Sequence, residues 1–488
     1  MLALIGFLII AVILVLLLTQ RVNAIVALAG VPFVGALIAG FSLSEVSEFA
    51  MTGIGGVVVV IAMFVFAIIY FGIVSDAAMF DPIVDRIVRF AGDRPATITL
   101  ATTLLAIVTH LDGAGASTFL ITIPAMLPLY ERMGMSRLVL ATCVALGAGV
   151  MNVVPWGGPT LRAAATAEVP ANELWVPLIP ARVVGLIAAL GIAFYLGMRE
   201  KKRLDRVAVG VTTAVVAEST ARIGANGLVI VSPEAAEADG RTAGATRTTG
   251  GADSADRAGA TGVPATDATA VATSSATDLR RPRLLWVNLL ITVAVVVLLV
   301  AGWLDPALCF VLGSILVLVI NYPNVKEQGE RINAHAPGAV LMTSTLIAAG
   351  VLLGVLSESG MVEELAQTGA NLLPAGLAPG LPLIAGILGV PLSLLFGPDA
   401  YYFGVMPVLM AVGEGFGVDG IHIAQASILG QETVGFPISP MTGSFFLLVG
   451  LAKVDIGRHI RHSFLWMWLL SIIMLLVAVV TGVIPGWV

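Results

Sequence analysis

Charged residues are scarce in this sequence. They make up 11% of its 488 residues, whereas hydrophobic residues make up 58% and the mean hydropathy is +1.00. Outside one segment, the apolar stretches are long enough to span the roughly 30 Å of hydrocarbon in a bilayer. The composition therefore predicts an all-α polytopic protein of the inner (plasma) membrane, surrounded by lipid.

Cysteine is almost absent. Cys143 and Cys309 lie in apolar runs without the spacing of metal ligands, so we interpret them as small core residues. The chain has no His/Cys cluster that would retain a metal ion, and we expect no resident cofactor. It also lacks the basic leader and cleavage site of a secretory signal before residues 2–18, so this apolar run is predicted to remain as a membrane helix.

Aromatic residues and hydrophobic periodicity disappear between residues 207 and 278, which are rich in Ala, Thr, Gly and Ser. This composition is typical of a disordered linker. Basic runs flank the segment, and between membrane helices they indicate a cytoplasmic location rather than a lipid or nucleic-acid patch. We therefore expect no nucleic-acid partner. The flanking residues are Arg199, Lys201, Lys202, Arg203, Arg206, Arg280, Arg281 and Arg283.

The loop charges fit a topology of two antiparallel halves. With the linker inside, five crossings per half plus one hairpin place both termini outside. An odd number of crossings makes the halves antiparallel, as in an inverted repeat. We predict a first membrane repeat at residues 1–200, a disordered cytoplasmic linker at 201–282 and a second, inverted membrane repeat at 283–488. Each repeat would hold about five transmembrane helices, a re-entrant hairpin and a discontinuous helix.

A pattern of helix breaks occurs twice, once in each half. The first break carries one aspartate after a short apolar arm, and it reads HLDGAGAST at 110–118 and FGPDAYYF at 396–403. The second break reads NVVPWGGPT at 152–160 and GFPISPMTGS at 435–444. Paired breaks at corresponding positions indicate the substrate site of a secondary transporter.

The two segments beside the first aspartate, residues 96–110 and 119–130, are shorter than the roughly 20 residues that a helix needs to cross a bilayer. They predict a re-entrant hairpin with its tip near the midplane, where exposed backbone amides and carbonyls become ligands. Helix starts at Thr118 and Thr160 would attract an anion. Carbonyls and the Asp112 carboxylate would attract a cation, so one site could hold both.

An amphipathic stretch precedes the first hairpin. Residues 81–90 place Ile83, Val84, Ile87 and Val88 on one face and charges on the other. Two interpretations stay open. The stretch is either an interfacial helix that holds a moving domain or an ordinary solvated loop helix.

Several runs together resemble one family. They are DGAGAST at 112–118, MNVVPWGGPTLRAA at 151–164, DAYYFGVMP at 399–407 and ASILGQ at 426–431, with NYPN at 321–324 and LLVGL at 447–451. The chain resembles the citrate-metal:proton symporters (CitMHS) of the ion transporter superfamily over nearly its whole length. It departs from their pattern at Ala114 and Ala116 and after Gln431. The resemblance implies proton-driven uptake of citrate complexed with a divalent metal, by a homodimer with an elevator-like movement.

Carboxylates at membrane depth are costly and usually functional. Asp112 and Asp399 are therefore candidates for proton or cation coupling and for contact with a substrate-bound metal, unless nearby amides hold them for structure alone. Glu432 is either a proton carrier or a partner of a neighbouring helix. His110 could titrate, touch the substrate or be a core histidine, and Gln431 could hold an ion or the partner hairpin.

Arg162 could bind a substrate carboxylate in a bidentate fork or snorkel to the interface. Hydroxyls, amides and glycines near the breaks could contact carboxylate oxygens, or merely cap helices and allow close backbone approach. These further substrate-binding candidates are Ser117, Thr118, Asn152, Gly157, Gly158, Thr160, Tyr401, Ser439, Thr442 and Ser444.

The predicted function is symport of protons with citrate whose charge is reduced by a divalent metal such as Mg²⁺ or Ca²⁺. Another di- or tricarboxylate, or a gluconate-like anion without metal, is the alternative substrate. A membrane enzyme is a rival class, but nothing orients Ser117, His110 and Asp112 as a triad. A channel would not need two broken repeats, so we predict a transporter that is not an enzyme.

Overall fold

The computed structural model describes residues 2–19, 21–225, 279–372 and 375–486, where all regular secondary structure is helical. The chain divides into two compact units, one formed by Met1–Lys202 with Leu279–Val488 and the other by Arg203–Asp278. Both predicted membrane repeats therefore contribute to a single unit. Helix α10 (Ile179–Ala225) makes residues 201–225 helical, although they were predicted as the start of a disordered linker. The rest of that segment, residues 226–278, lies outside the described residues.

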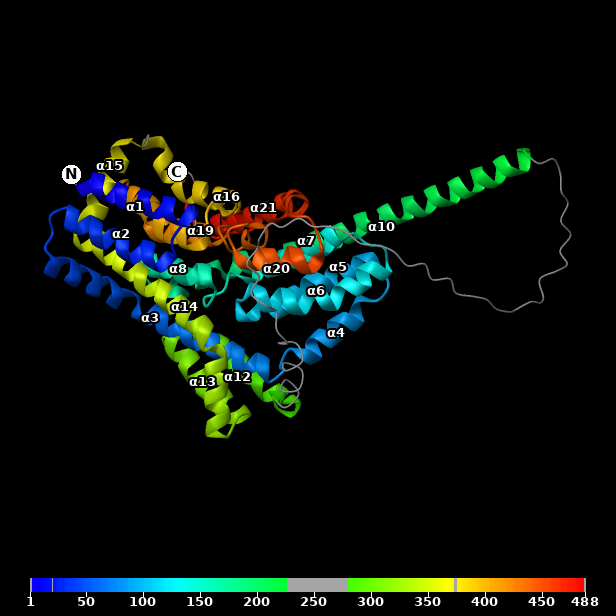
Figure 1. The fold of residues 1–488 in the computed structure, drawn as a ribbon, viewed down its shortest axis with the longest axis horizontal. Helices are drawn as coiled ribbons and strands as arrows, with labels where there is room; N and C mark the ends of the chain where they lie inside the picture. The colour runs from blue at the N-terminus through cyan, green and yellow to red at the C-terminus, as the bar shows by residue number, and fades with distance from the viewer. Residues whose placement is uncertain (1, 20, 226–278, 373–374, 487–488) are drawn as a thin grey trace, which may run out of the picture. The chain divides into compact units, whose positions relative to one another are not determined.

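The two halves of the chain contain similar series of helices, most of which Figure 1 labels, although the short helices Ala171–Trp175 and Pro398–Ala400 have no counterpart in the other half. The first half contains α1 (Leu2–Leu18), α2 (Ala24–Ile38), α3 (Leu43–Asp76), α4 (Asp81–Ala91), α5 (Pro95–Thr109), α6 (Gly115–Arg132), α7 (Arg137–Met151), α8 (Gly158–Ala167), α9 (Ala171–Trp175) and α10. The second half contains α12 (Leu285–Ala301), α13 (Pro306–Asn321), α14 (Val325–Glu358), α15 (Met361–Leu372), α16 (Leu381–Ser393), α17 (Pro398–Ala400), α18 (Met406–Gly415), α19 (Gly420–Ile428), α20 (Gly443–Ala452) and α21 (Ile456–Val480).

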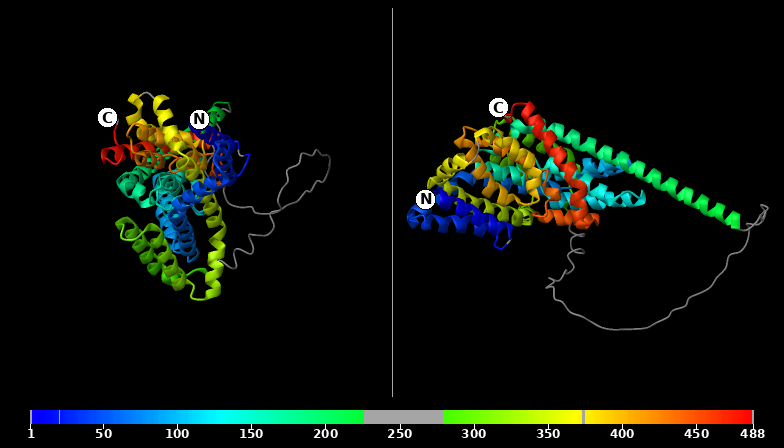
Figure 2. Two further views of the ribbon diagram at one scale, coloured as in Figure 1. Left: turned by 90° about the vertical axis from the view of Figure 1, so that its left-hand side faces the viewer. Right: turned by 90° about the horizontal axis from the view of Figure 1, so that it is seen from above.

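Helix contacts repeat between the halves as well. Helix α3 packs against α13, as α14 packs against α2, and α5 packs against α7, as α16 packs against α19. The two long helices α3 and α14, of 34 residues each, also pack against one another (Figures 1 and 2). This arrangement fits two structural repeats, and their inversion stays a prediction.

Seven helical segments in the described part of the chain are long and apolar enough to cross a membrane. Five shorter apolar helices accompany them, among them α1, α7 and α20. The predicted multi-pass, all-helical class is therefore confirmed. The count of five crossings per half stays a prediction. The seven segments are Leu43–Asp76, Pro95–Asp112, Ala171–Arg206, Pro282–Ala301, Val325–Glu358, Gly376–Ser393 and Ile456–Val480.

The crossing of α3 and α14 depends on glycine. A Cβ atom added to Gly53 would lie 2.1 Å from the carbonyl oxygen of Gly350, and one added to Gly354 would lie 2.1 Å from that of Phe49. Any larger residue would push the two backbones apart, because small residues are what lets membrane helices approach so closely. The two long helices therefore meet backbone to backbone.

The two helices predicted beside the first aspartate are present, and the re-entrant course of this hairpin stays a prediction. Helices α5 and α6 pack against each other and are joined by a 3₁₀ turn at His110–Asp112, although α6 begins four residues earlier than the predicted arm. The amphipathic stretch forms α4, which packs against α5 with Ile87 buried. Proline and glycine end the corresponding arm in the second half, where α16 stops at Ser393 and α17 begins at Pro398.

Candidate functional site

All four helix breaks meet at one cavity of about 150 Å³. Its lining comes from both aspartate tips and from both second breaks, so segments nearly 300 residues apart in the sequence face the same space. Helix α20, for example, lies against α6 (Figure 1). The lining residues are His110, Gly113, Gly115, Asn152, Gly158, Pro159, Arg162, Pro398, Glu432, Phe436, Thr442 and Ser444.

The first aspartate stabilises its own turn. The Asp112 carboxylate accepts hydrogen bonds from the amide of Ala114 at 2.9 Å and from the hydroxyl of Ser117 at 2.5 Å. Gly113 adopts a left-handed conformation with φ 73°, which glycine adopts without a Cβ penalty. Asp112 and Ser117 therefore hold the tip and lie beside the cavity lining rather than in it.

His110 reaches the cavity with one side of its ring. Its Nδ1 lies 2.7 Å from the hydroxyl of Thr118, and its ring stacks on Phe436 with centroids 5.4 Å apart. Its Nε2 has no hydrogen-bond partner among the described residues. The ring therefore fills space between the two halves, and this second nitrogen is buried.

The second break of the first half is tied to both neighbours. Trp156 donates its indole N–H to the carbonyl of Leu111 at 2.8 Å, which joins the break to the tip. Asn152 donates its amide to the carbonyl of Glu432 at 3.0 Å, which joins the two second breaks. A Cβ on Gly157 would lie 2.6 Å from the Asn152 carbonyl oxygen, so the chain turns there without a side chain.

Arg162 pairs with the second aspartate. Its Nε donates to Oδ1 of Asp399 at 2.7 Å, across 237 residues of sequence. The Arg162 side chain is 8% exposed and that of Asp399 is 26% exposed. Asp399 lines a separate cavity of about 120 Å³, together with Leu17 and Met441. The ion pair therefore lies between two cavities.

Glu432 is a buried carboxyl group in a strained position. Its φ is 51°, which is unusual for a residue with a side chain. One carboxyl oxygen lies 2.6 Å from the hydroxyl of Ser439, and the other has no partner among the described residues. The Ser439 hydroxyl also lies 2.5 Å from the carbonyl oxygen of Ser393.

Three of the longer helices begin at the cavity. Helices α6, α8 and α20 start at Gly115, Gly158 and Gly443, two to three residues before the starts predicted at Thr118 and Thr160 in the first half. Their free amides and the Arg162 guanidinium favour an anion, whereas Glu432 introduces an acid. Among the described residues, no group of three or more His, Cys, Asp or Glu side chains is placed to hold a metal ion.

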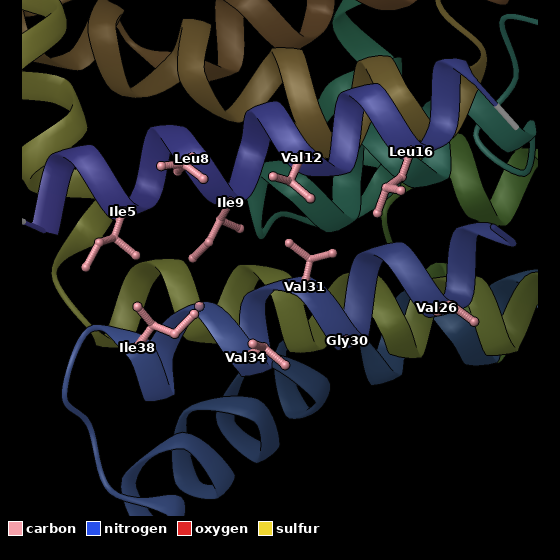
Figure 3. A pocket seen from close by; sticks show the side chains of 11 residues that line it. Ile5, Leu8, Ile9, Val12, Leu16, Val26, Gly30, Val31, Val34 and Ile38 are labelled. Carbon is pink, nitrogen blue, oxygen red and sulfur yellow. The ribbon is translucent and has the colours of Figure 1, made fainter. Parts of the chain in front are cut away.

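A larger cavity of about 510 Å³ lies between α1 and α2, but its chemistry is different. Figure 3 shows Ile5, Ile9, Val31 and Ile38 among the aliphatic side chains that line it. Its lining consists of Ile, Leu, Val and Gly alone, so it offers nothing to a charged substrate. We therefore take the smaller cavity at the breaks as the candidate site.

Comparison with known proteins shows the family of the chain. The citrate transporter family model CitMHS matches residues 4–430. The chain belongs to the citrate transporter family. A "Citrate transporter" of Bacillus subtilis (strain 168) is 37% identical, over 99% of this chain and all of the relative. A "Mg(2+)/citrate complex secondary transporter" of the same strain is 34% identical, over 99% of both chains.

One further relative and one solved structure were also compared. An uncharacterized transporter of B. subtilis, YraO, is 32% identical over 99% of both chains. Among solved structures, the YdaH transporter of Alcanivorax borkumensis is 14% identical with a TM-score of 0.49, over 90% of this chain and 87% of that chain. Membership of the citrate transporter family confirms the resemblance read from the sequence motifs, and it establishes a multi-pass transporter rather than an enzyme.

In this member of the citrate transporter family, the structure brings together part of the predicted site. His110, Asn152, Gly158, Arg162, Glu432, Thr442 and Ser444 line the cavity. The other candidates stand behind or beside the lining. Gln431 is bonded to Ser393 and Phe396, Tyr401 is bonded to Ser427, and Thr160 is buried without a partner for its hydroxyl among the described residues. This second group consists of Asp112, Ser117, Thr118, Gly157, Thr160, Asp399, Tyr401, Gln431 and Ser439.

The sequence argument did not single out five lining residues. They are small, cyclic or aromatic and carry no polar side chain, and they lie within or beside the motifs already quoted. Glycine and proline at a break expose backbone amides and carbonyls to the cavity. The glycines and prolines at the breaks could therefore have been predicted as lining residues, and these are four of the five. The five residues are Gly113, Gly115, Pro159, Pro398 and Phe436.

Proposed function

We propose that this protein carries citrate complexed with a divalent metal ion into the cell together with protons. The observation behind the proposal is the cavity where Arg162 and the starts of α6, α8 and α20 meet the carboxyl group of Glu432. Arg162 and the helix starts attract a carboxylate. Glu432 offers a place for a proton. The name of the relative that is 34% identical supports a metal-bound substrate.

The metal would travel as cargo. Citrate with three negative charges is costly to bury, whereas its complex with one divalent ion keeps a single negative charge. Mg²⁺ and Ca²⁺ prefer oxygen ligands, which citrate supplies itself. Asp112 would meet the metal only when it is bound to the substrate, whereas Asp399, predicted to do the same, is paired with Arg162.

The hydrogen bonds of Ser439 support a proton on Glu432. A serine hydroxyl has one proton to donate, yet that of Ser439 lies within 2.6 Å of two acceptors, the Ser393 carbonyl oxygen and the Glu432 carboxyl group. Both contacts become hydrogen bonds if Glu432 is protonated and donates to Ser439, which then donates to Ser393. A protonated Glu432 also avoids an unpaired buried charge.

An elevator-like movement is part of the proposal. The tips and second breaks are joined by side-chain hydrogen bonds through Trp156, Asn152 and Gln431, which supports their moving together. The glycine crossing of α3 and α14 supports a scaffold against which they move. The protein would work as a homodimer, with the predicted linker, residues 201–282, on the cytoplasmic side.

The test is uptake of labelled citrate into proteoliposomes under an inward proton gradient, with Mg²⁺, Ca²⁺ or a chelator outside. We expect uptake to require both a divalent metal and the gradient, and to saturate. Empty liposomes and a proton uncoupler are the controls. Uptake that a chelator leaves unchanged would contradict the metal complex, and uptake that an uncoupler leaves unchanged would contradict proton coupling.

Another di- or tricarboxylate, or a gluconate-like anion without metal, is the second candidate substrate. The departures at Ala114 and Ala116 favour keeping it, because both lie at the tip beside the cavity. Competition of unlabelled succinate, malate or gluconate with labelled citrate in the same proteoliposomes decides between them. Stronger inhibition by one of these anions than by metal-citrate would favour the second candidate.

A further inference from the structure

Arg162 is the one lysine or arginine among the residues that line the site cavity, and its charge is already paired. Its Nε donates to Oδ1 of Asp399 at 2.7 Å. A guanidinium as buried as this one is costly without a partner. Asp399 therefore occupies, in this structure, the position on Arg162 that a substrate carboxylate would need.

The pair uses only part of the guanidinium. Among the described residues, Oδ1 of Asp399 is the one carboxylate oxygen bonded to Arg162, and Nη2 reaches only the sulfur of Met342 at 3.5 Å. Nη1 lies over Gly158, where an added Cβ would come within 2.9 Å. Sulfur is a weak acceptor. A substrate carboxylate that formed two parallel hydrogen bonds with Arg162 would bind more strongly than Asp399 does.

The second cavity can accept the Asp399 side chain when it leaves Arg162. Asp399 lines the second cavity, and the neighbouring Pro398 lines both cavities. It also belongs to a three-residue helix, α17, followed by a π-helix at Tyr401–Val405. Wide helical turns of this kind are frequent at functional sites. The segment that holds Asp399 is therefore less regular than α8, which holds Arg162.

We infer that a carboxylate of the substrate replaces Asp399 on Arg162, and that the released Asp399 turns into the second cavity and takes up a proton. The inference rests on the proposed function and identifies the step that couples substrate to proton. One ion pair breaks, another forms, and one proton from solvent binds the Asp399 carboxylate. The Arg162–Asp399 pair is neutral before the exchange, and with a substrate of one negative charge the group of Arg162, substrate and protonated Asp399 is neutral after it.

Calorimetric binding of Mg²⁺-citrate to the purified full-length protein tests the exchange, in buffers of different ionisation enthalpy. We expect the wild type to take up about one proton per substrate in this step. Asp399→Asn should bind about tenfold more tightly near neutral pH, because the competitor is gone, with about one proton fewer. Asp399→Glu keeps the carboxylate and is the matched control. Weaker or unchanged binding by Asp399→Asn, or an unchanged proton count, would overturn the inference.

A double variant separates competition from a general charge effect. If Asp399 acts through Arg162, adding Asp399→Asn to Arg162→Gln should leave affinity unchanged, because coupled residues are not additive. The same gain in both backgrounds would contradict exchange at Arg162. Melting temperature and size-exclusion profile show whether each variant is folded.

Chemical labelling tests, without any substrate, whether Asp399 shields Arg162. Phenylglyoxal modifies free guanidinium groups, and mass spectrometry follows the peptide that contains Arg162. Asp399→Asn should raise the rate of labelling several-fold over the wild type and over Asp399→Glu, and equal rates would contradict shielding by Asp399. A wild type that binds neither citrate nor Mg²⁺-citrate would contradict the proposed function, and protection from phenylglyoxal by other carboxylates would then test the exchange.

Discussion

The second breaks of the two halves are built alike but carry different chemistry. In each half, one side chain in or shortly before the second break donates a hydrogen bond to the backbone shortly before the aspartate. Trp156 bonds to Leu111 at 2.8 Å, and Gln431 bonds to Phe396 at 3.2 Å. The first half supplies the cation, Arg162, whereas the second half supplies the acids, Asp399 and Glu432. The two halves thus share a backbone arrangement but differ in charge. We expect the first half to bind the substrate carboxylate and the second half to bind protons.

Removal of the cation should have the largest effect. Arg162→Gln leaves Asp399 buried without its partner and takes away the one permanent positive charge of the lining. We expect citrate uptake to fall by about 100-fold or more, because charge-assisted bidentate hydrogen bonds are among the strongest. Initial rates in proteoliposomes measure it, with Arg162→Lys as the conservative control. Uptake near the wild-type rate would place the anion elsewhere.

Replacement of Glu432 should impair proton-driven accumulation of citrate more than citrate counterflow. Glu432→Gln keeps the shape of the side chain but cannot release a proton, so we expect proton-driven accumulation of citrate to fall by about tenfold or more. Counterflow between internal and external citrate should stay within about threefold of the wild type, because it needs no net proton movement. Equal loss of both activities would mean that Glu432 serves structure instead.

The contact between the halves is open to a stability test. Gly53→Ala would place a Cβ 2.1 Å from the Gly350 carbonyl oxygen, whereas Gly55→Ala in the same helix meets nothing within 4 Å. We expect Gly53→Ala to lower the free energy of unfolding by about 1–3 kcal/mol. Gly55→Ala should leave it unchanged or raise it slightly. Thermal melting in detergent compares the two variants, and identical melting would contradict a close crossing.

The smallest effect is expected from loss of the hydrogen bond between Trp156 and Leu111. Trp156→Phe removes the hydrogen bond to Leu111 while it keeps the ring between Phe71 and Phe310. Loss of one such bond costs about 1 kcal/mol, so citrate affinity should fall by about five-fold. Binding calorimetry measures the change. Trp156→Phe with unchanged affinity would mean that the backbone alone positions the first tip.

The sequence predicted the four breaks because glycine, proline and short apolar arms are local signals. Helix starts near Thr118 and Thr160 were placed two to three residues late, since α6 and α8 begin at glycines that carry no capping side chain. Length and apolar composition likewise sufficed for the helical, multi-pass class. Local patterns therefore located the site along the chain.

Other parts of the site depend on contacts that no local pattern encodes. The pairing of Arg162 with Asp399 and the bond from Asn152 to Glu432 span 237 and 280 residues. The local backbone conformation decides whether a carboxylate faces the cavity. Asp112 accepts a hydrogen bond from Ala114 in its own turn, whereas Glu432 has a positive φ and lines the cavity. The tertiary fold alone decides between these arrangements.

The glycine crossing of α3 and α14 also limits how the molecule can deform. Two helices that touch through bare backbone interlock, because the flanking Phe49 and Val57 are bulkier and resist sliding in either direction. We expect the crossing to act as a fixed contact in the elevator-like movement proposed above. If the helices around the cavity move through the bilayer with the substrate, the contact between α3 and α14 stays in place. These two long helices would then be the most stationary part of the chain.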